Sequence, residues 1–342
     1  MELAASFRTQ ASACRLLGSP MYGELLDVLA DEHGAGGPFR ELMRGHEDDP
    51  GPSALGLRLL GSVHRLVLTG RAPELATFYP SVGGTHIPAA TDEAFMRLIK
   101  QQPDAVLEWI DHQVQTNEVG RAAALYGGLL QLPWRLPVRL FEMGASGGLN
   151  LLADRFAYVT RDGVLGDPGS AVRLDPAWAH GPTEWPLEIV ERVGSDLAPV
   201  DVTTEEGRLT LTAYVWPDQA LRLARLRGAL DLASATPLAV AEQDAVSFVR
   251  AIRPEEGTAT VLWHSVMLQY LSKEDREQVI AGIEELGAAA TERSPFAHLS
   301  LEPTRRTPES EHEFLVVLQT WPGGETRVYG KAAPHGLPVT WD

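Results

Sequence analysis

The segment from Phe141 to Asn150 constrains the fold of this 342-residue chain more than any other part of the sequence. It reads Phe-Glu-Met-Gly-Ala-Ser-Gly-Gly-Leu-Asn, follows an apolar run at 136–141, and precedes an apolar-periodic segment that begins at Leu149. This order predicts a strand, a glycine-rich turn and a helix. Glycines let the backbone turn tightly and leave room for a ligand beside the N–H groups of a helix N-terminus. The segment therefore predicts a ligand site at the end of a strand.

Two kinds of site fit this segment. Glu142 stands two residues before Gly144, which is the arrangement that S-adenosylmethionine (SAM) enzymes of the Rossmann-like class use. In that arrangement the carboxylate, near the end of the first strand, can accept hydrogen bonds from the cationic amino end of the cofactor. Gly144, Ser146 and Gly148 also form Gly-x-Ser-x-Gly, the nucleophile elbow of α/β-hydrolases.

The hydrolase hypothesis requires Ser146 as nucleophile, followed along the chain by an acid and then a histidine. Candidates of both kinds are present: the acids Asp244 and Glu302, and the histidines His312 and His335. Two observations weigh against it. Glu142 would place a negative charge beside the nucleophile and oppose a developing oxyanion, and no His-Gly-Gly-Gly-type segment follows an earlier strand. We therefore favour SAM binding over hydrolysis.

Composition narrows the classes of partner. The net charge is −17, with 29 Lys and Arg against 46 Asp and Glu, and no basic run exceeds two residues. Nucleic-acid binding is therefore not expected, because phosphate contacts need clustered basic side chains. No stretch approaches the roughly 20 apolar residues that cross a bilayer, and the N-terminus does not resemble a secretory signal. We expect a cytoplasmic protein with a small-molecule substrate and no membrane or nucleic-acid partner.

The hydrophobic pattern changes along the chain. Residues 1–130 show apolar spacing typical of helices, as at 22–33 and 57–68. Residues 131–342 alternate short β-rich runs with helices, which indicates a parallel sheet with crossover helices. We predict strands at 138–142, 189–193, 238–241, 260–263 and 297–301, then an antiparallel hairpin at 313–320 and 326–331. A helix is predicted at 273–289, and an insertion of a hairpin and loops at about 157–188.

These elements predict an α/β fold: a Rossmann-like, seven-stranded sheet of the methyltransferase type, mostly parallel, with a helical N-terminal domain that covers part of the site. The antiparallel C-terminal hairpin supports this fold, because SAM methyltransferases end with an antiparallel strand inserted into the sheet.

Ionisable residues stand at five predicted strand ends. In doubly wound sheets, ligands bind beyond the carboxyl ends of the strands. After Glu142, Asp196 follows the second strand and can accept from ribose hydroxyls, and Asp244 follows the third and can reach an adenine amino group. His264 follows the fourth strand, where a neutral imidazole can take a proton from a methyl acceptor. Glu302 follows the fifth.

Several segments together resemble a bacterial family of unknown function, over nearly the whole chain. They are Gln115–Arg121, Glu142–Leu152, Asp196–Asp201, Trp216–Gln219 and Trp263–Leu271. The resemblance implies a methyltransferase-like Rossmann domain behind a helical N-terminal region, and it implies no substrate. One feature departs from ordinary methyltransferases, since Asp196 lies 48 positions after Gly148 (196 minus 148) rather than about 20.

The predicted function is SAM-dependent methyl transfer to a small molecule, with His264 as the catalytic residue. The alternatives are a non-catalytic SAM- or nucleotide-binding regulatory protein, or a serine hydrolase that uses Ser146. No metal is predicted, because a single cysteine is present and the histidines show no ligand spacing. The predicted cofactor-binding residues are Glu142, Gly144, Ala145, Ser146, Gly148, Asn150, Asp196, Asp244, Asn117 and Arg121. The predicted substrate residues are Tyr270, Glu302 and Trp216.

Overall fold

The structure is a computed structural model that describes residues 3–46, 49 and 54–342. The chain divides into two compact units, each formed by two segments of sequence. The first, which we call the helical unit, comprises Met1–Thr116 and Glu205–Leu223. The second, the sheet unit, comprises Asn117–Thr204 and Ala224–Asp342. The return of residues 205–223 to the helical unit has no counterpart in the hydrophobic pattern of the sequence.

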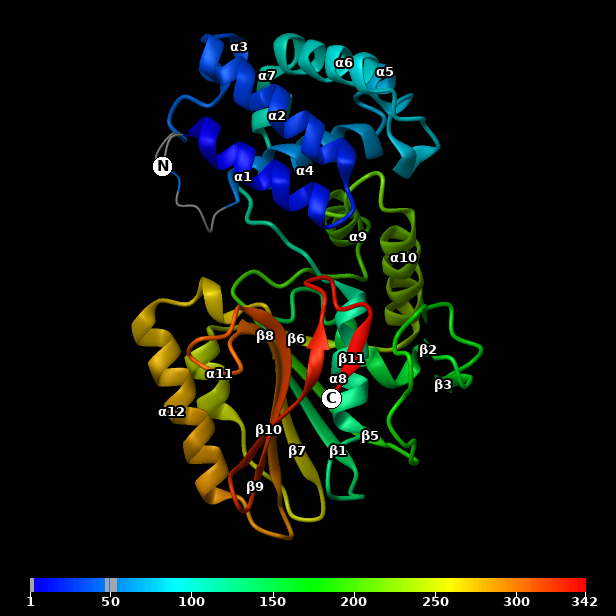
Figure 1. The fold of residues 1–342 in the computed structure, drawn as a ribbon, viewed down its shortest axis with the longest axis vertical. Helices are drawn as coiled ribbons and strands as arrows, with labels where there is room; N and C mark the ends of the chain where they lie inside the picture. Colours follow the sequence, from blue (N-terminus) through cyan, green and yellow to red (C-terminus); the bar gives the residue numbers. More distant parts are fainter. Residues whose placement is uncertain (1–2, 47–48, 50–53) are drawn as a thin grey trace. The chain divides into compact units, whose positions relative to one another are not determined.

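The helical unit consists of helices joined by loops (Figure 1), and its apolar side chains form one core. Proline begins five of the α-helices and the 3-10 helix η2, at a position where its missing N–H costs no hydrogen bond. The helices predicted at 22–33 and 57–68 are confirmed as α2 and α4. The elements of this unit are α1 (Leu3–Leu16), α2 (Pro20–Ala35), α3 (Pro38–Leu42), α4 (Leu55–Leu68), α5 (Pro73–Ala76), η2 (Pro80–Val82), α6 (Pro88–Gln101), α7 (Pro103–Leu107) and α9 (Glu205–Ala213).

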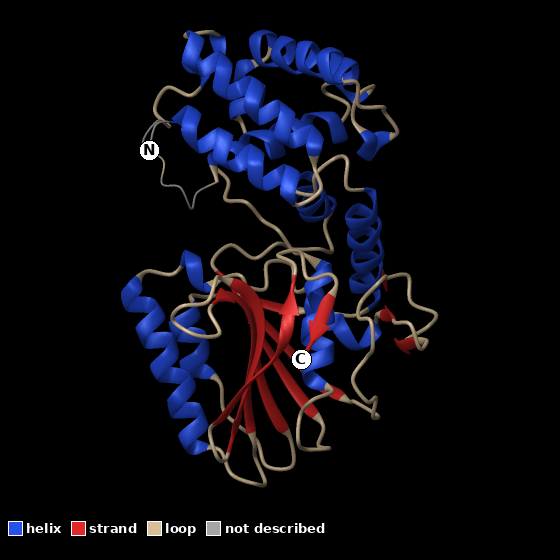
Figure 2. Cartoon of the chain, in the orientation of Figure 1, coloured by secondary structure: helices blue, strands red, loops and turns tan. Residues whose placement is uncertain are grey.

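The sheet unit is built on an eight-stranded sheet with the order β11-β10-β9-β8-β7-β1-β5-β6. Figure 2 shows the strands of this unit in red. The strands are β1 (Val138–Met143), β5 (Ile189–Asp196), β6 (Ala239–Glu242), β7 (Ala259–Ser265), β8 (Phe296–Thr304), β9 (Glu313–Trp321), β10 (Glu325–Ala332) and β11 (Val339–Trp341). The five strands from β1 to β8 in this list run parallel. Strands β9, β10 and β11 are added antiparallel at the β8 edge. The five predicted parallel strands and the terminal hairpin are therefore confirmed.

Two details of the predicted sheet are wrong. The sheet has eight strands instead of seven, because Val339–Trp341 pairs with β10, and three residues are too few for a period-two pattern to reveal. The strands after β8 also extend the sheet in chain order, so none is inserted between earlier strands.

Helices cover both faces of this sheet. On one face, Phe141, Leu262 and Phe296 pack into a core with α11 (Ala245–Ala251) and α12 (Lys273–Ala289). On the other lies α8 (Ala122–Leu129), whose Gly128 is in close contact with the Leu299 side chain. All six residues of β1 are buried, as expected of a central parallel strand.

The helix predicted at 273–289 is confirmed as α12, with the Ser272 side chain accepting from the Asp275 backbone N–H at 3.0 Å. The helix expected after the glycine turn is instead η4 (Leu149–Arg155), a seven-residue 3-10 helix with non-helical angles at Leu152. Three buried leucines in four residues leave no polar face for an amphipathic α-helix.

The segment at 157–188 contains the predicted hairpin, β2 (Ala157–Val159) with β3 (Val164–Gly166), and β4 (Arg173–Leu174) pairs with β2 to complete a small separate sheet. The remaining elements are η3 (Val119–Arg121), α10 (Ala220–Ala235) and η5 (Leu268–Tyr270). Within the described residues, no helix is long and apolar enough to cross a membrane.

Candidate functional site

The candidate site lies at the carboxyl ends of β1 and β7. In chain order the parallel strands run outward from β1 through β5 to β6 on one side, and through β7 to β8 on the other. The strand order therefore reverses between β1 and β7. Open α/β sheets bind ligands beyond the carboxyl ends of the strands at such a point. The glycine-rich segment from Gly144 to Gly148, which we call the glycine loop, begins here.

Glu142 is the central polar residue of this edge. Its side chain is buried at 2% exposure, and its Oε1 accepts from Trp263 Nε1 at 3.2 Å and from Asn150 Nδ2 at 3.5 Å. Its other oxygen, Oε2, is buried and has no hydrogen-bond partner, and the same is true of Asn150 Oδ1. The two hydrogen-bonded side chains of Glu142 and Asn150 thus each keep one buried oxygen atom without a hydrogen-bond partner. Such atoms cost free energy until a donor reaches them.

Burial raises the pKa of the Glu142 carboxyl from 4.5 to about 8. The hydrogen bonds from Asn150 and Trp263 act in the opposite direction, and so does the positive charge of Arg121, while the carboxylate of Asp196 adds to the increase. Without a ligand, the carboxyl is therefore mostly protonated at pH 7. A cationic donor beside it would favour the ionised form and lower this pKa again.

Several N–H groups of the glycine loop already donate to acceptors of the protein. Ser146 N donates to Asp196 Oδ2 at 2.8 Å, and directly after the loop Leu149 N donates to Asn117 Oδ1 at 3.0 Å. The N–H groups of Ala145 and Gly148 donate to backbone carbonyl oxygens at 2.9 and 2.8 Å. A loop that cradles phosphate must present its N–H groups to the ligand. The glycine loop suits a ligand without phosphate better.

The carboxylates of Asp196 and Asp244 both hold local structure. Asp196 is the last residue of β5; in addition to the bond from Ser146 N, its Oδ1 accepts from Ala198 N at 3.0 Å. Asp244 is exposed and caps α11 by accepting from Ser247 N at 2.8 Å, and hydrogen bonding to Ser247 lowers its pKa. Asp196 thus touches the glycine loop, whereas Asp244 stands at the carboxyl end of β6 as a helix cap.

Two backbone outliers mark the same edge. Ser146 and Val266 both have φ of +53°, in the left-handed region that residues other than glycine rarely adopt. Ser146 lies in the glycine loop after β1, and Val266 directly follows β7. Strained residues of this kind persist where the surrounding structure holds them, and they gather at functional sites. In the described chain, only Ala54 shares this property.

The structure does not bring the His264 side chain to Glu142 and its partners Asn150 and Trp263. Both β7 and β8 run further than the sequence predicts, so that His264 and Glu302 lie within strands rather than after them. Trp263 shares a face of the sheet with Glu142, because the two are hydrogen-bonded, and its neighbour His264 therefore points to the opposite face. There His264 is buried at 1% exposure, between Glu302 Oε1 (2.8 Å from Nδ1) and His298 Nε2 (2.9 Å from Nε2).

Of the three other predicted site residues, Arg121 lies at the edge of the site, whereas Tyr270 is exposed and Trp216 lies in the core of the helical unit. Arg121 donates from Nη1 to Ser265 O at 3.3 Å and from Nε to Pro334 O at 3.1 Å, which places it beside the end of β7. Tyr270 is 64% exposed in η5. Trp216 belongs to the core of the helical unit, where its ring packs near that of Tyr22 with centroids 6.1 Å apart.

Sequence reasoning missed Trp263, His298 and Val266. Trp263 acquires its role through the register of β7 against β1, and His298 through the register of β8 against β7. No local pattern reveals the register between strands distant in sequence. A weak signal existed for Trp263, because a large aromatic residue beside a histidine in a buried strand must face the other side of the sheet.

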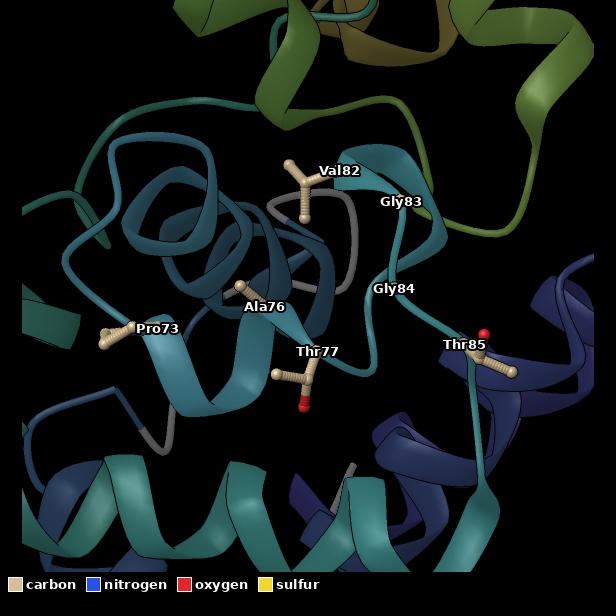
Figure 3. Close-up of a pocket in the computed structure, with 7 residues that line it drawn as sticks. All are labelled: Pro73, Ala76, Thr77, Val82, Gly83, Gly84 and Thr85. Atoms are coloured by element: carbon tan, nitrogen blue, oxygen red, sulfur yellow. The ribbon is translucent and has the colours of Figure 1, made fainter.

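The helical unit contains an open depression of about 440 Å³. It lies between α5 and the segment around Gly83 and Gly84, and its walls carry no ionisable side chain (Figure 3). It therefore offers no ionisable group for acid–base chemistry. Across residues 3–46, 49 and 54–342, no group of three or more His, Cys, Asp or Glu side chains is arranged to hold a metal ion.

The family model described as "Uncharacterized protein conserved in bacteria (DUF2332)" matches residues 4–341. The chain therefore belongs to this bacterial family, as its sequence motifs suggested. No curated protein matches the chain in sequence.

Proposed function

We propose that this member of the DUF2332 family binds SAM at the carboxyl ends of β1 and β7 and transfers its methyl group to a small molecule. The observation that carries the proposal is the buried, unpartnered Oε2 of Glu142 at the end of the first strand. The order of the five parallel strands supports a Rossmann-like sheet, although the C-terminal strands depart from the methyltransferase pattern.

The residues of the site fit an amino acid moiety. An ammonium group offers three donors and a positive charge. Glu142 Oε2 and Asn150 Oδ1 offer two unpartnered oxygen atoms on neighbouring side chains, and Glu142 offers one negative charge after ionisation. The charge of Arg121 acts on Glu142, so it also lies within electrostatic reach of a carboxylate bound there. The glycine loop, in which the N–H groups of Ala145, Ser146 and Gly148 already donate to protein acceptors, suits a cofactor that has no phosphate. When bound, SAM supplies a sulfonium leaving group, so the protein mainly needs to position the acceptor.

A specific observation favours a second candidate function, SAM binding without turnover. The ring nitrogens of His264, the predicted proton acceptor, already contact Glu302 and His298. The serine-hydrolase hypothesis gains less support. Of the acids considered for it, Asp244 caps a helix and Glu302 binds His264.

Calorimetry on the purified protein tests SAM binding. We expect heat with SAM and with its demethylated product, and none with ATP or NAD. Glu142→Gln is expected to weaken SAM binding about 10- to 100-fold, because it removes a hydrogen bond to a charged group. Glu284→Gln, on the exposed surface of α12, is the matched control. Absence of binding at millimolar SAM would exclude the proposal.

Proton release provides a second readout of the same experiment. Glu142 is mostly protonated at pH 7 without ligand, and a bound ammonium would ionise it. Titrations in buffers of different ionisation enthalpy should therefore show the release of up to about one proton at pH 7. Incubation with SAM and an extract of small molecules then separates the two candidate functions, because only a methyltransferase forms the demethylated product.

A further inference from the structure

Glu302 is a buried carboxylate whose contacts converge on a single oxygen. Its Oε1 lies 2.8 Å from His264 Nδ1 and accepts from the backbone N–H groups of Met267 at 2.9 Å and Leu268 at 3.4 Å. The residue lies in β8, two strands away from β1 in the sheet, and is 8% exposed. One carboxylate thus connects the interior of β7 with the turn that follows β7.

That turn, residues 265–268, holds a strained backbone. Val266 has φ of +53°, which is costly for a β-branched residue because its Cβ crowds the adjacent carbonyl oxygen. Val266 N donates to Leu301 O at 2.9 Å, and the next two N–H groups donate to Glu302. A conformation of this cost persists only when its surroundings hold it in place. Three bonds to β8 therefore restrain this turn, two of them through Glu302. Arg276 Nη2 restrains its far end by donating to Leu268 O at 2.7 Å.

The same turn borders the glycine loop. A Cβ atom added at Gly144 would lie 3.2 Å from Met267 Cβ, so the two segments are in contact. Arg121 donates to Ser265 O at the other end of the turn, and its charge acts on Glu142. The turn therefore forms one wall of the edge at which the ligand is proposed to bind. A shift of Met267 would alter the space beside Gly144.

We propose that Glu302 is a positioning residue that holds the turn 265–268 against the glycine loop and thereby keeps the ligand site in its binding conformation. This role in ligand binding rests on the proposed function. His264 and His298 hold Glu302 from within the sheet. His264 lies between Glu302 and His298, and its ring is stacked on that of His298 at a centroid distance of 5.0 Å. His264 thereby acts on the site through Glu302 rather than on the methyl acceptor.

Amide hydrogen exchange tests the first half of this proposal without any ligand. In Glu302→Ala, the exchange of Met267 and Leu268 should accelerate at least about tenfold, because both amides lose their acceptor. Glu302→Gln keeps an oxygen at this position and should stay within about threefold of the wild type. Glu284→Ala is the control and should not change the exchange of this turn. Unchanged exchange in Glu302→Ala, or equal acceleration in Glu302→Ala and Glu302→Gln, overturns the proposal.

Calorimetry with SAM tests the second half. SAM affinity should fall at least about tenfold in Glu302→Ala and be rescued to within about threefold in Glu302→Gln. A turn that loosens without any loss of affinity would show that it is no part of the site. If the wild type binds no SAM, the proposed function fails, yet the exchange data still decide whether Glu302 holds the turn.

Folding failure of Glu302→Ala would be visible in a thermal melt. Glu302→Asp then replaces it, because the shorter side chain keeps the charge but withdraws the acceptor from Met267 and Leu268. It should accelerate exchange of the turn as the alanine variant does. Wild-type exchange in Glu302→Asp would overturn the proposal.

Discussion

Replacement of Glu142 by glutamine should stabilise the ligand-free protein, and by an amount that grows with pH. The folded chain holds this carboxyl at a pKa of about 8, against an ordinary value of 4.5. Between these two values the folded state binds more protons than the unfolded state. The free energy of unfolding therefore falls as pH rises through this window. The contribution of the protonated carboxyl is complete below pH 4.5 and is lost as pH passes 8.

The magnitude follows from the same two values. Each pKa unit corresponds to about 1.4 kcal/mol, so the loss reaches roughly 5 kcal/mol well above pH 8 and roughly 3 kcal/mol at pH 7. Glutamine has nearly the same shape, keeps an oxygen for Trp263 and Asn150, and does not ionise. Its amide also offers donors to Asn150 Oδ1, which lacks a partner. The variant should therefore avoid this loss at every pH.

Urea unfolding followed by circular dichroism measures the effect, without ligand, at pH values from 5 to 8.5. The wild type and Glu142→Gln should differ little at pH 5, and the variant should be the more stable by roughly 3 kcal/mol at pH 7. The exposed control Glu284→Gln should follow the wild type throughout. A difference between Glu142→Gln and wild type that does not change with pH would refute the reasoning, because the carboxyl would then not titrate in this window.

Two further predictions concern the aspartate after β6 and the serine of the glycine loop. Asp244→Ala should lower the free energy of unfolding by about 1 kcal/mol, the usual cost of losing a helix N-cap, and leave SAM affinity unchanged. A loss of affinity at unchanged stability in thermal melts and calorimetry would instead support the adenine contact that the sequence suggests. Ser146 should not react with a fluorophosphonate, as measured by intact mass. A covalent label that disappears in Ser146→Ala would establish a serine hydrolase and contradict methyl transfer.

Much of the sheet unit could be predicted because its signals are local. The apolar runs of the central strands β1 and β7 are buried on both faces, and such runs can be recognised without knowledge of the neighbouring strands. The cap of α12 is encoded in four consecutive residues from Ser272 to Asp275. The predictions became less accurate where a local pattern was short. β11 has three residues, and the segment after the glycine loop forms a 3-10 helix whose first four residues include three buried leucines.

The ends of the strands were also harder to predict, and the error affected which residues were expected to follow a strand at the site. Polar residues such as Asp196, His264 and Glu302 read as the residues that follow strands, yet the backbone ladder continues through all three. A ladder ends where its neighbours end, which depends on pairing rather than on the residue itself. The sequence therefore placed these side chains near the correct edge of the sheet and left open the face to which each one points.

The sequence by itself determined that a carboxyl group, a glycine loop and a set of ionisable residues meet at one edge of a parallel sheet. Only the tertiary structure decided that Glu142 is buried with an unpartnered oxygen, and that His264 faces away from it. The indole that binds Glu142 comes from Trp263, 121 residues further along the chain. The pKa of the carboxyl depends on such packing, because burial and hydrogen bonding act over a few ångströms in space, however far apart the residues lie in sequence.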